Sequence, residues 1–394
     1  MIVRRILLDE VKVPARADSI NSPEVDYALH KLPVGGKQGW TQQFDQVSKT
    51  MIQLEFDNGI VGLGESYRGI PTELMRAVAT ELIGADLRKM NLQALALPAG
   101  RVYDGYECAL TDALAKCHNI PLYQLLGGKY RDNIRVAAWA GHRTTPDAAR
   151  KAKEAKALGY ECIKFKCTVT DPVADWCREI RGACGKDFWV VLDPNERFEI
   201  PANAERIARE LEEIGNVLYL EDPIPRWNYD GWRYLRSKIH VAISMHVSLP
   251  YLEMGQMPQD AARAAKLDCN DYFHFNGGIF AFRRLTALAD LFAIPYSHGS
   301  ELDFGILESS YVHKVAASAL GTMPSDVFGR LIREHDLLKK SLEIKDGKAA
   351  VPQGAGLGVE LDLAAVEHYG PDHTSRFSLY SNSRSISRFA LPHN

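Results

Sequence analysis

The sequence lacks the features that most simply assign a protein to a class. Its 394 residues contain no apolar run long enough to cross a bilayer. Its 47 basic and 50 acidic residues nearly cancel, leaving a net charge of −3. This balance gives no reason to expect nucleic acid or an anionic membrane as a partner. There is also no G-x-G-x-x-G after an early strand, which argues against a dinucleotide-binding sheet.

Cysteine is scarce and follows no recognisable pattern. The seven cysteines are odd in number and include no C-x-x-C pair. This favours reduced thiols acting as small core residues. The first stretch, "MIVRRILLDEVKV", alternates like a strand and lacks the long apolar segment and cleavage site of a secretory signal. We therefore expect a cytoplasmic protein.

The amino-terminal part, residues 1–128, predicts an α+β domain. Alternating stretches flank Asp57-Asn58-Gly59 in "VSKTMIQLEFDNGIVGLGES" and indicate a β-hairpin. Residues 72–94 and 104–126 have helical patterns, and the second ends at a glycine pair.

From Ile134 onward, short apolar strands alternate with helical segments. Seven or eight such units favour a parallel (β/α) barrel, and an open doubly wound sheet is the alternative. The strands are expected at "IRVAAWA", "ECIKFK", "FWVVLD", "VLYLED", "HVAIS", "DYFHF" and "IPYSH".

Two lysines, Lys164 and Lys166, lie one residue apart inside "CIKFKCTVTD". Residues i and i+2 of a strand face the same side, so both ammonium groups should project together. A solvated surface strand would explain them simply, but the apolar neighbours Cys162, Ile163 and Phe165 argue against exposure. Burying two such charges is costly unless negative charge lies opposite them.

Polar residues follow the apolar stretches of the next strands as well: Asp193, Glu221, His246, Asn276 and His298. In a parallel barrel these carboxyl ends meet where chemistry occurs. One such Asp is explained by helix N-capping, but a series of five favours a shared site. Asp193 and Glu221 are oxygen donors suited to Mg²⁺. A nearby lysine with a lowered pKa could remove a proton next to a carboxylate.

Together these motifs resemble the enolase superfamily, in its mandelate racemase/muconate lactonizing enzyme group. The resemblance covers nearly the whole chain and rests on "GLGES", "ALTDALAKCHNIPLYQLLGGKYRDNIRV", K-x-K, "LDPNE", "LEDP", "GGI" and "PQGAGLGVE". It implies a (β/α)7β TIM-like barrel at 129–345 with an α+β N-terminal capping domain at 1–128. Residues 346–394 would return to the cap and end in a tail. Mg²⁺ would be the cofactor, and the protein would form a homo-oligomer.

The resemblance also implies roles for individual residues. Lys164 resembles the lysine that contacts the substrate carboxylate, and Lys166 resembles the acid/base lysine. Asp193 and Glu221 resemble two metal ligands. His298 resembles a base on the opposite side of the substrate.

Further residues are expected to contact the substrate. The cap loops, residues 19–42 and the region of Tyr67 and Arg68, resemble loops that close on it. Arg68 would bind an anionic or polyhydroxy molecule, or would be an ordinary exposed loop arginine.

The sequence departs from the family pattern where the third metal ligand should be acidic. His246 stands at that position. Imidazole suits Zn²⁺, Mn²⁺ or Fe²⁺ better than Mg²⁺. The metal would then be bound by two acids and a histidine, held weakly, or absent. A histidine that contacts substrate or shuttles protons is the alternative.

A second departure follows the sixth strand, where Asn276 replaces an expected Asp. His298 should then be a weaker base. His274 could substitute for it or be a buried core histidine. Glu301 could be the partner of His298 or a substrate ligand. The region of the eighth strand contains Asp326 but no residue that is clearly a catalytic carboxylate.

The sequence thus predicts an enzyme for a small carboxylate substrate. The first hypothesis is a lyase that dehydrates a sugar acid or related hydroxy acid, with Lys166 or His298 taking the proton. A racemase or epimerase is the second, and the Asp missing beside His298 counts against it. A cycloisomerase is the third. A non-catalytic binding relative with an eroded metal site is the alternative from another class.

Overall fold

The computed structural model describes residues 1–25, 30–31, 41–42, 46–68, 70–97, 101–247, 257–370 and 377–380. Much of the predicted cap loop 19–42 and the tail 381–394 lie outside these ranges. The strands are β1 (Val3–Pro14), β2 (His30–Lys31), β3 (Thr41–Gln42), β4 (Gln46–Phe56), β5 (Val61–Glu65), β6 (Asn133–Arg135), β7 (Ala138–Ala140), β8 (Cys162–Lys166), β9 (Trp189–Asp193), β10 (Val217–Glu221), β11 (Ile243–Val247), β12 (Tyr272–Phe275), β13 (Tyr296–His298), β14 (Ile344–Lys345), β15 (Lys348–Ala350) and β16 (Phe377–Tyr380). The helices are α1 (Thr72–Leu82), η1 (Leu87–Lys89), α2 (Arg101–Cys117), α3 (Leu122–Leu125), α4 (Thr145–Ala157), α5 (Val173–Cys184), α6 (Pro201–Ile214), α7 (Tyr229–Lys238), α8 (Met257–Lys266), α9 (Ile279–Leu291), α10 (Gly305–Ala316), α11 (Gly329–Ile332) and α12 (Leu363–His368).

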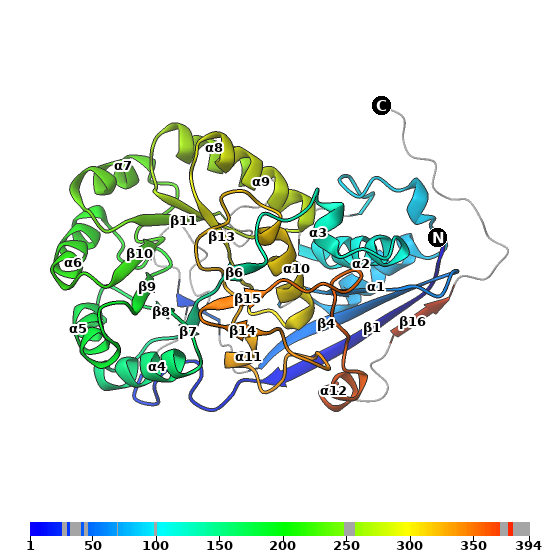
Figure 1. Cartoon of the computed structure of the whole chain (residues 1–394), viewed down its shortest axis with the longest axis horizontal. Helices are drawn as coiled ribbons and strands as arrows, with labels where there is room; N and C mark the ends of the chain where they lie inside the picture. The colour runs from blue at the N-terminus through cyan, green and yellow to red at the C-terminus, as the bar shows by residue number, and fades with distance from the viewer. Residues whose placement is uncertain are drawn as a thin grey trace.

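Seven parallel strands, in the order β7 to β13, form the wall of a barrel. The segment after α10 closes it. Ser325 pairs in parallel with Val136, and the Asp326 amide donates to the His298 carbonyl at 2.8 Å. Helices α4 to α9 lie outside these strands (Figure 1). The predicted TIM-like barrel is therefore confirmed.

Apolar residues between strands and helices form the largest core cluster of the described residues. Phe165 of β8 points into this layer and packs against Trp176 of α5, with ring centroids 5.7 Å apart. Because side chains alternate along a strand, Lys164 and Lys166 on either side of Phe165 face the barrel interior.

The amino-terminal region forms a sheet in the order β16-β1-β4-β5, packed on α1 and α2 (Figure 1). The turn at Asp57–Gly59 joins β4 and β5 as predicted. Strand β16 pairs with β1, so the carboxyl-terminal segment returns to this sheet. We call this region the cap; its exact boundaries with the barrel remain a prediction.

Both long helices predicted in the cap are shorter than expected. Helix α1 ends at Leu82, because Ile83 is extended and Gly84 has a φ of +82°. Helix α2 ends at Cys117. Asn119 then takes a φ of +53°, and a separate short helix, α3, begins after Pro121.

Three buried carboxylates of the cap bind backbone amides elsewhere in the chain, and we call them the cap carboxylates: Glu65, Glu107 and Asp112. Glu65 accepts from Phe304 N at 2.7 Å and Leu307 N at 3.1 Å, at the start of α10. Glu107 accepts from Ile279 N and Phe280 N at the start of α9. Asp112 accepts from Leu63 N and Leu357 N. The unpaired N–H groups at a helix start need acceptors, so the contacts of Glu65 and Glu107 hold the cap on the barrel, whereas Asp112 joins α2 to β5 and to the segment around Leu357.

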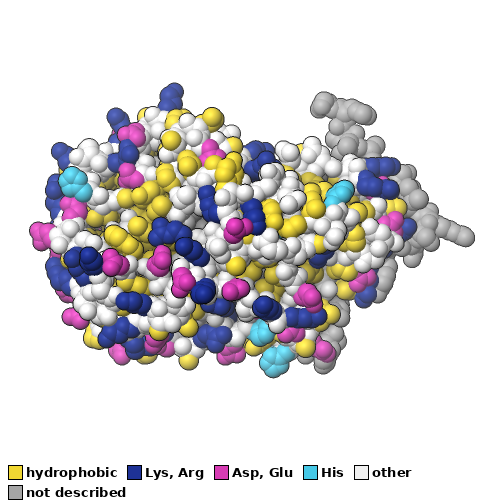
Figure 2. Space-filling view, in the orientation of Figure 1, with side chains coloured by type: hydrophobic (Ala, Val, Ile, Leu, Met, Phe, Trp, Pro, Cys, Tyr) yellow, Lys and Arg dark blue, Asp and Glu magenta, His cyan; other side chains and the backbone are white. Residues whose placement is uncertain are grey.

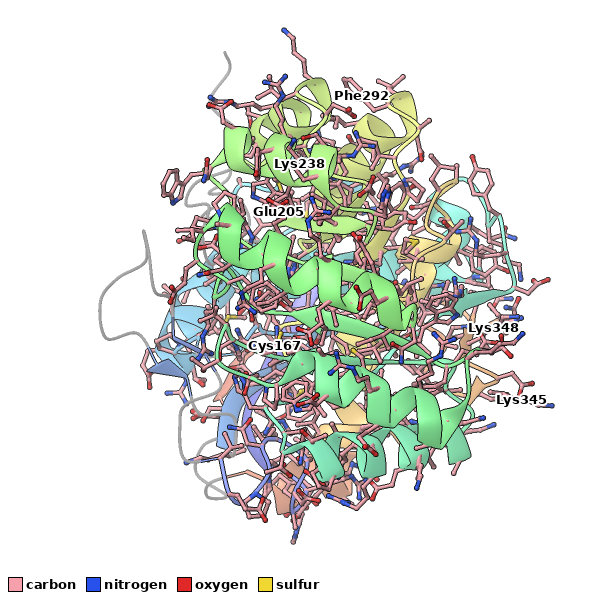
Figure 3. All side chains as sticks on the ribbon, turned by 90° about the vertical axis from the view of Figure 1, so that its left-hand side faces the viewer. Cys167, Glu205, Lys238, Phe292, Lys345 and Lys348 are labelled. Atoms are coloured by element: carbon pink, nitrogen blue, oxygen red, sulfur yellow. The ribbon has the colours of Figure 1, made fainter. Side chains whose placement is uncertain are left out.

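The two ends of the barrel differ. In Figure 3, Cys167, directly after β8, lies toward one side of the molecule. Lys345 and Lys348 of the β14–β15 hairpin lie at the other side. Strand β15 pairs with β6, which comes directly before the first barrel strand, β7. The hairpin therefore lies at the amino-terminal end of the barrel strands. The carboxyl-terminal ends face the opposite way.

One face of the molecule shows no dominance of one charge. On the face in Figure 2, basic and acidic side chains are interspersed over the barrel helices. No helix within the described ranges combines the length and apolar character needed to span a bilayer.

Candidate active site

Lys164 lies at the centre of a buried acidic cluster inside the barrel. Its side chain is 2% exposed, and Nζ lies 2.7 Å from Glu221, 3.0 Å from Asp326 and 3.2 Å from Asp193. Burial favours the neutral amine, but the three carboxylates outweigh it and raise the pKa of Lys164 well above its usual value. Lys164 is therefore a cation that balances part of this negative charge.

Lys166, one strand position further on, lies nearer the barrel mouth. Its Nζ donates to Asp193 and, at 2.8 Å, to Asn195 Oδ1. Asp193 lies directly opposite Lys166 in the β8–β9 register, and its second oxygen accepts from Asn195 N at 3.1 Å. The predicted pair of lysines thus faces the predicted carboxylates, as the cost of burying two amines requires.

Glu221 and His246 meet at the ends of β10 and β11. Glu221 Oε1 lies 3.2 Å from His246 Nδ1, while Oε2 contacts Lys164. Burial opposes ionisation of Glu221, but His274, Lys164 and His246 lower its pKa well below its usual value. Glu221 is therefore ionised and able to bind a cation.

A chain of contacts connects His246 with the cap. His246 Nε2 lies 3.0 Å from Asn276 Oδ1, and Asn276 Nδ2 donates to Glu301 Oε1 at 3.1 Å. Glu301 Oε2 lies 3.3 Å from an Arg68 guanidinium nitrogen. Arg68 is only 7% exposed, so it is not the exposed loop arginine considered above.

His298 is fully buried at the end of β13. Its Nδ1 lies 2.5 Å from the Gly299 carbonyl, which makes Nδ1 the protonated nitrogen, and its ring stacks on Tyr311. Nε2 has no hydrogen-bond partner within the described residues. Burial, together with the positive charge of Lys314, holds the pKa of His298 well below its usual value. His298 is thus neutral, with an unshared lone pair on Nε2.

Sequence reasoning undervalued Asp326. Besides Lys164, it contacts His274 Nε2 at 3.1 Å, and His274 Nδ1 contacts Ser297. Lys164 and His274 lower the pKa of Asp326 to about 2, against the effect of burial. A usable signal was present: Asp326 follows the segment that occupies the eighth strand position of the barrel.

Tyr67 belongs to the contact between cap and barrel. It is 2% exposed and hydrogen-bonds Asp104 of α2. Burial, with the nearby Asp104, raises the pKa of Tyr67 well above 10. Its role as a substrate ligand remains a prediction.

The described residues contain one group of three metal-ligating side chains, namely Glu221, Asp222 and His246. Their ligand atoms all lie within 4.8 Å of one another. Asp222 also contacts Arg226 and accepts from His246 N at 2.8 Å. The predicted ligands Glu221 and His246 are therefore adjacent, whereas Asp193 is held by the two lysines. A cation bridging Asp193 and Glu221 would need the Lys164 ammonium to move.

Comparison with known proteins agrees with this architecture. Residues 147–365 match the family model "Enolase C-terminal domain-like", and residues 40–127 match "Mandelate racemase / muconate lactonizing enzyme, N-terminal domain". The D-xylonate dehydratase of Haloferax volcanii is 28% identical over 357 residues, covering 80% of this chain and 84% of that protein. A chloromuconate cycloisomerase of Delftia acidovorans is 30% identical over 342 residues, covering 79% and 88%.

Solved structures agree at the level of the fold. The N-succinyl Arg/Lys racemase of Bacillus cereus superposes with a TM-score of 0.79 at 20% identity, covering 96% of this chain and 100% of that chain. At this identity the match establishes the architecture and not the reaction.

Proposed function

Because the chain belongs to the mandelate racemase/muconate lactonizing enzyme group of the enolase superfamily, we propose that it is a metal-dependent lyase. Its substrate would be a sugar acid or related hydroxy acid. The reaction would remove the proton next to the carboxylate and expel the β-hydroxyl as water. The observation that carries this proposal is the convergence of Lys164 and Lys166 on Asp193 and Glu221.

The donor set suits a divalent cation. Glu221 is ionised, and His246 presents Nδ1 next to it at 3.2 Å. Glu221 and His246 would hold the cation, with Asp193 or Asp222 as a further ligand. A bound divalent cation would stabilise negative charge developing on the substrate carboxylate.

The chain supplies both a proton acceptor and a proton donor. His298 is neutral, and within the described residues its Nε2 has no hydrogen-bond partner, so it can accept the proton from carbon, although its low pKa makes it a weak base. Lys166, paired with Asp193, can donate a proton to the departing hydroxyl, which is a poor leaving group. Lys164 would hold the substrate carboxylate, and Arg68 and Glu301 would bind its hydroxyl groups.

The low pKa of His298 favours dehydration over racemisation. Racemisation requires the groups on both faces to accept and to donate a proton. His298 donates to a backbone carbonyl through Nδ1, and its low pKa leaves very little of the ring protonated near neutral pH, so little of it can return a proton from that face. Dehydration requires His298 only to accept a proton.

A cycloisomerase is the second candidate function. The 30% identity with a chloromuconate cycloisomerase favours it. The lysines and carboxylates of this site would be available to either reaction, so the products must decide between the two.

The test is incubation in D₂O with Mg²⁺ or Mn²⁺ and a panel of sugar acids and muconates, followed by NMR and mass spectrometry. We expect a keto-deoxy acid from at least one sugar acid. Lys166→Ala should lower the rate by about 10²–10⁴-fold. Lys238→Ala, on the outside of α7 (Figure 3), should not change it. Exchange without dehydration, or lactone formation alone, would contradict the lyase proposal.

A further inference from the structure

We propose that Asn276 and Glu301 hold the His246 imidazole with Nδ1 turned toward Glu221, so that the site binds its cation through nitrogen and prefers a transition metal to Mg²⁺. This inference rests on the proposed metal site. It adds two positioning residues and the class of metal.

The orientation of the Asn276 amide follows from its neighbours. Glu301 Oε1 lies 3.1 Å from one end of the amide, and a carboxylate only accepts hydrogen bonds. That end must therefore be the NH₂ group. The amide oxygen then faces His246 Nε2 at 3.0 Å, and Nε2 must carry a hydrogen to make this bond.

His246 Nδ1 is therefore the nitrogen that carries the lone pair in the neutral ring. It lies 3.2 Å from Glu221 Oε1. Two lone pairs at this distance repel, so either a proton or a metal cation must lie between Nδ1 and Oε1, and a bound metal would take the place of the proton. Two ligand atoms this far apart can share one cation at ordinary bond lengths of about 2.1 Å. A ligating histidine typically donates its other N–H to a fixed acceptor, as His246 does here.

The surroundings keep this arrangement in place. His246, Asn276 and Glu301 are 8%, 1% and 4% exposed. Gly299 lies against the pair, and a Cβ built there would overlap both Asn276 Oδ1 and His246 Nε2. Glu301 in turn contacts Arg68, so the chain of contacts starts in the cap.

The nitrogen donor determines which metal is favoured. A site of carboxylate oxygens alone suits Mg²⁺, whereas imidazole adds affinity for Mn²⁺, Co²⁺ or Zn²⁺. Replacing His246 by Asp should restore an all-oxygen site. Its preference for Co²⁺ over Mg²⁺ should fall relative to the wild-type chain.

The experiment measures metal binding without turnover. The full chain is titrated with Mn²⁺, Co²⁺ and Mg²⁺, and pulsed EPR of the Mn²⁺ form records coupling to ¹⁴N. We expect ¹⁴N coupling in the wild-type chain and in the control His240→Ala, which alters an exposed histidine. The coupling should disappear in His246→Asp while Mn²⁺ still binds.

The positioning residues are tested by loss and rescue. Asn276→Ala and Gly299→Ala should weaken Co²⁺ binding by about 10–100-fold. The double variant Asn276→Asp with Glu301→Gln exchanges donor and acceptor but keeps both hydrogen bonds. It should restore binding and ¹⁴N coupling, provided circular dichroism shows each variant folded.

Two failures have different meanings. Mn²⁺ binding without ¹⁴N coupling in the wild-type chain would overturn this inference and leave the proposed lyase intact. A chain that binds none of the three metals would overturn the proposed function as well.

Discussion

Two buried groups of carboxylates can be compared in this molecule. The cap carboxylates Glu65, Glu107 and Asp112 each accept two hydrogen bonds from backbone amides. The barrel carboxylates, defined as Asp193, Glu221 and Asp326, are contacted mainly by the side chains of lysine and histidine. Both groups are almost fully buried.

The difference separates attachment from chemistry. A backbone amide at a helix start is fixed by the helix and cannot leave its acceptor without local unfolding. A lysine or histidine side chain can rotate away and be replaced by a metal or a substrate. Glu65 and Glu107 therefore hold the cap on the barrel, and although Glu65 and Asp112 also contact Lys49 and Lys116, the backbone amides keep them in place. The barrel carboxylates, by contrast, can exchange partners.

The largest effect should come from removing the central cation of the barrel carboxylates. Lys164→Met leaves three buried carboxylates without it and should lower the free energy of unfolding by about 3–5 kcal/mol. Urea unfolding with EDTA present measures this. The control Lys339→Met breaks an exposed pair with Glu360 and should leave the free energy of unfolding nearly unchanged. Equal effects of the two variants would remove the proposed role of Lys164.

A change in the cap should affect stability and leave metal binding alone. Glu65→Gln weakens charged hydrogen bonds to Phe304 N and Lys49 and should cost about 1.5–3 kcal/mol. Metal affinity, measured by titration, should not change. The matched barrel variant Glu221→Gln should lose most metal affinity. If both variants impaired metal binding alike, the two groups would not be independent.

The smallest effect concerns pH. Burial, reinforced by Asp104, raises the pKa of Glu107 to about 8, although the amides of Phe280 and Ile279 oppose this. A raised folded-state pKa means that the native state holds the proton more tightly. The contribution is complete below about pH 4.5 and is lost as pH rises through about 8.

Glu107→Gln should therefore flatten the fall in stability between these pH values, as measured by urea unfolding at several pH values. Burial also raises the pKa of Asp104, to about 6, so a weaker fall in stability with pH should remain in the Glu107→Gln variant. The control Glu360→Gln removes an exposed carboxyl whose pKa Lys339 lowers, so it should not alter stability in this range. An unchanged slope in Glu107→Gln would mean that this carboxylate stays ionised when folded.

Local pattern favoured a parallel barrel over an open sheet and indicated which side of it carries polar residues. Alternation along a strand placed Lys164 and Lys166 on one face, and the register of β8 with β9 confirms that Lys166 is opposite Asp193. The two long cap helices were predicted too long, because turns at Gly84 and Asn119 interrupt a pattern that looks continuous.

The sequence by itself determined the barrel, the paired lysines and the acidic strand ends, because these follow from periodicities of a few residues. Only the tertiary structure decided their partners. Lys164 meets Asp326 across 162 positions, and Glu65 meets the start of α10 across 239. The orientation of His246 likewise depends on Asn276 and Glu301, which adjacent strands bring together. No local pattern encodes such contacts, since they arise when the barrel closes and the cap docks on it.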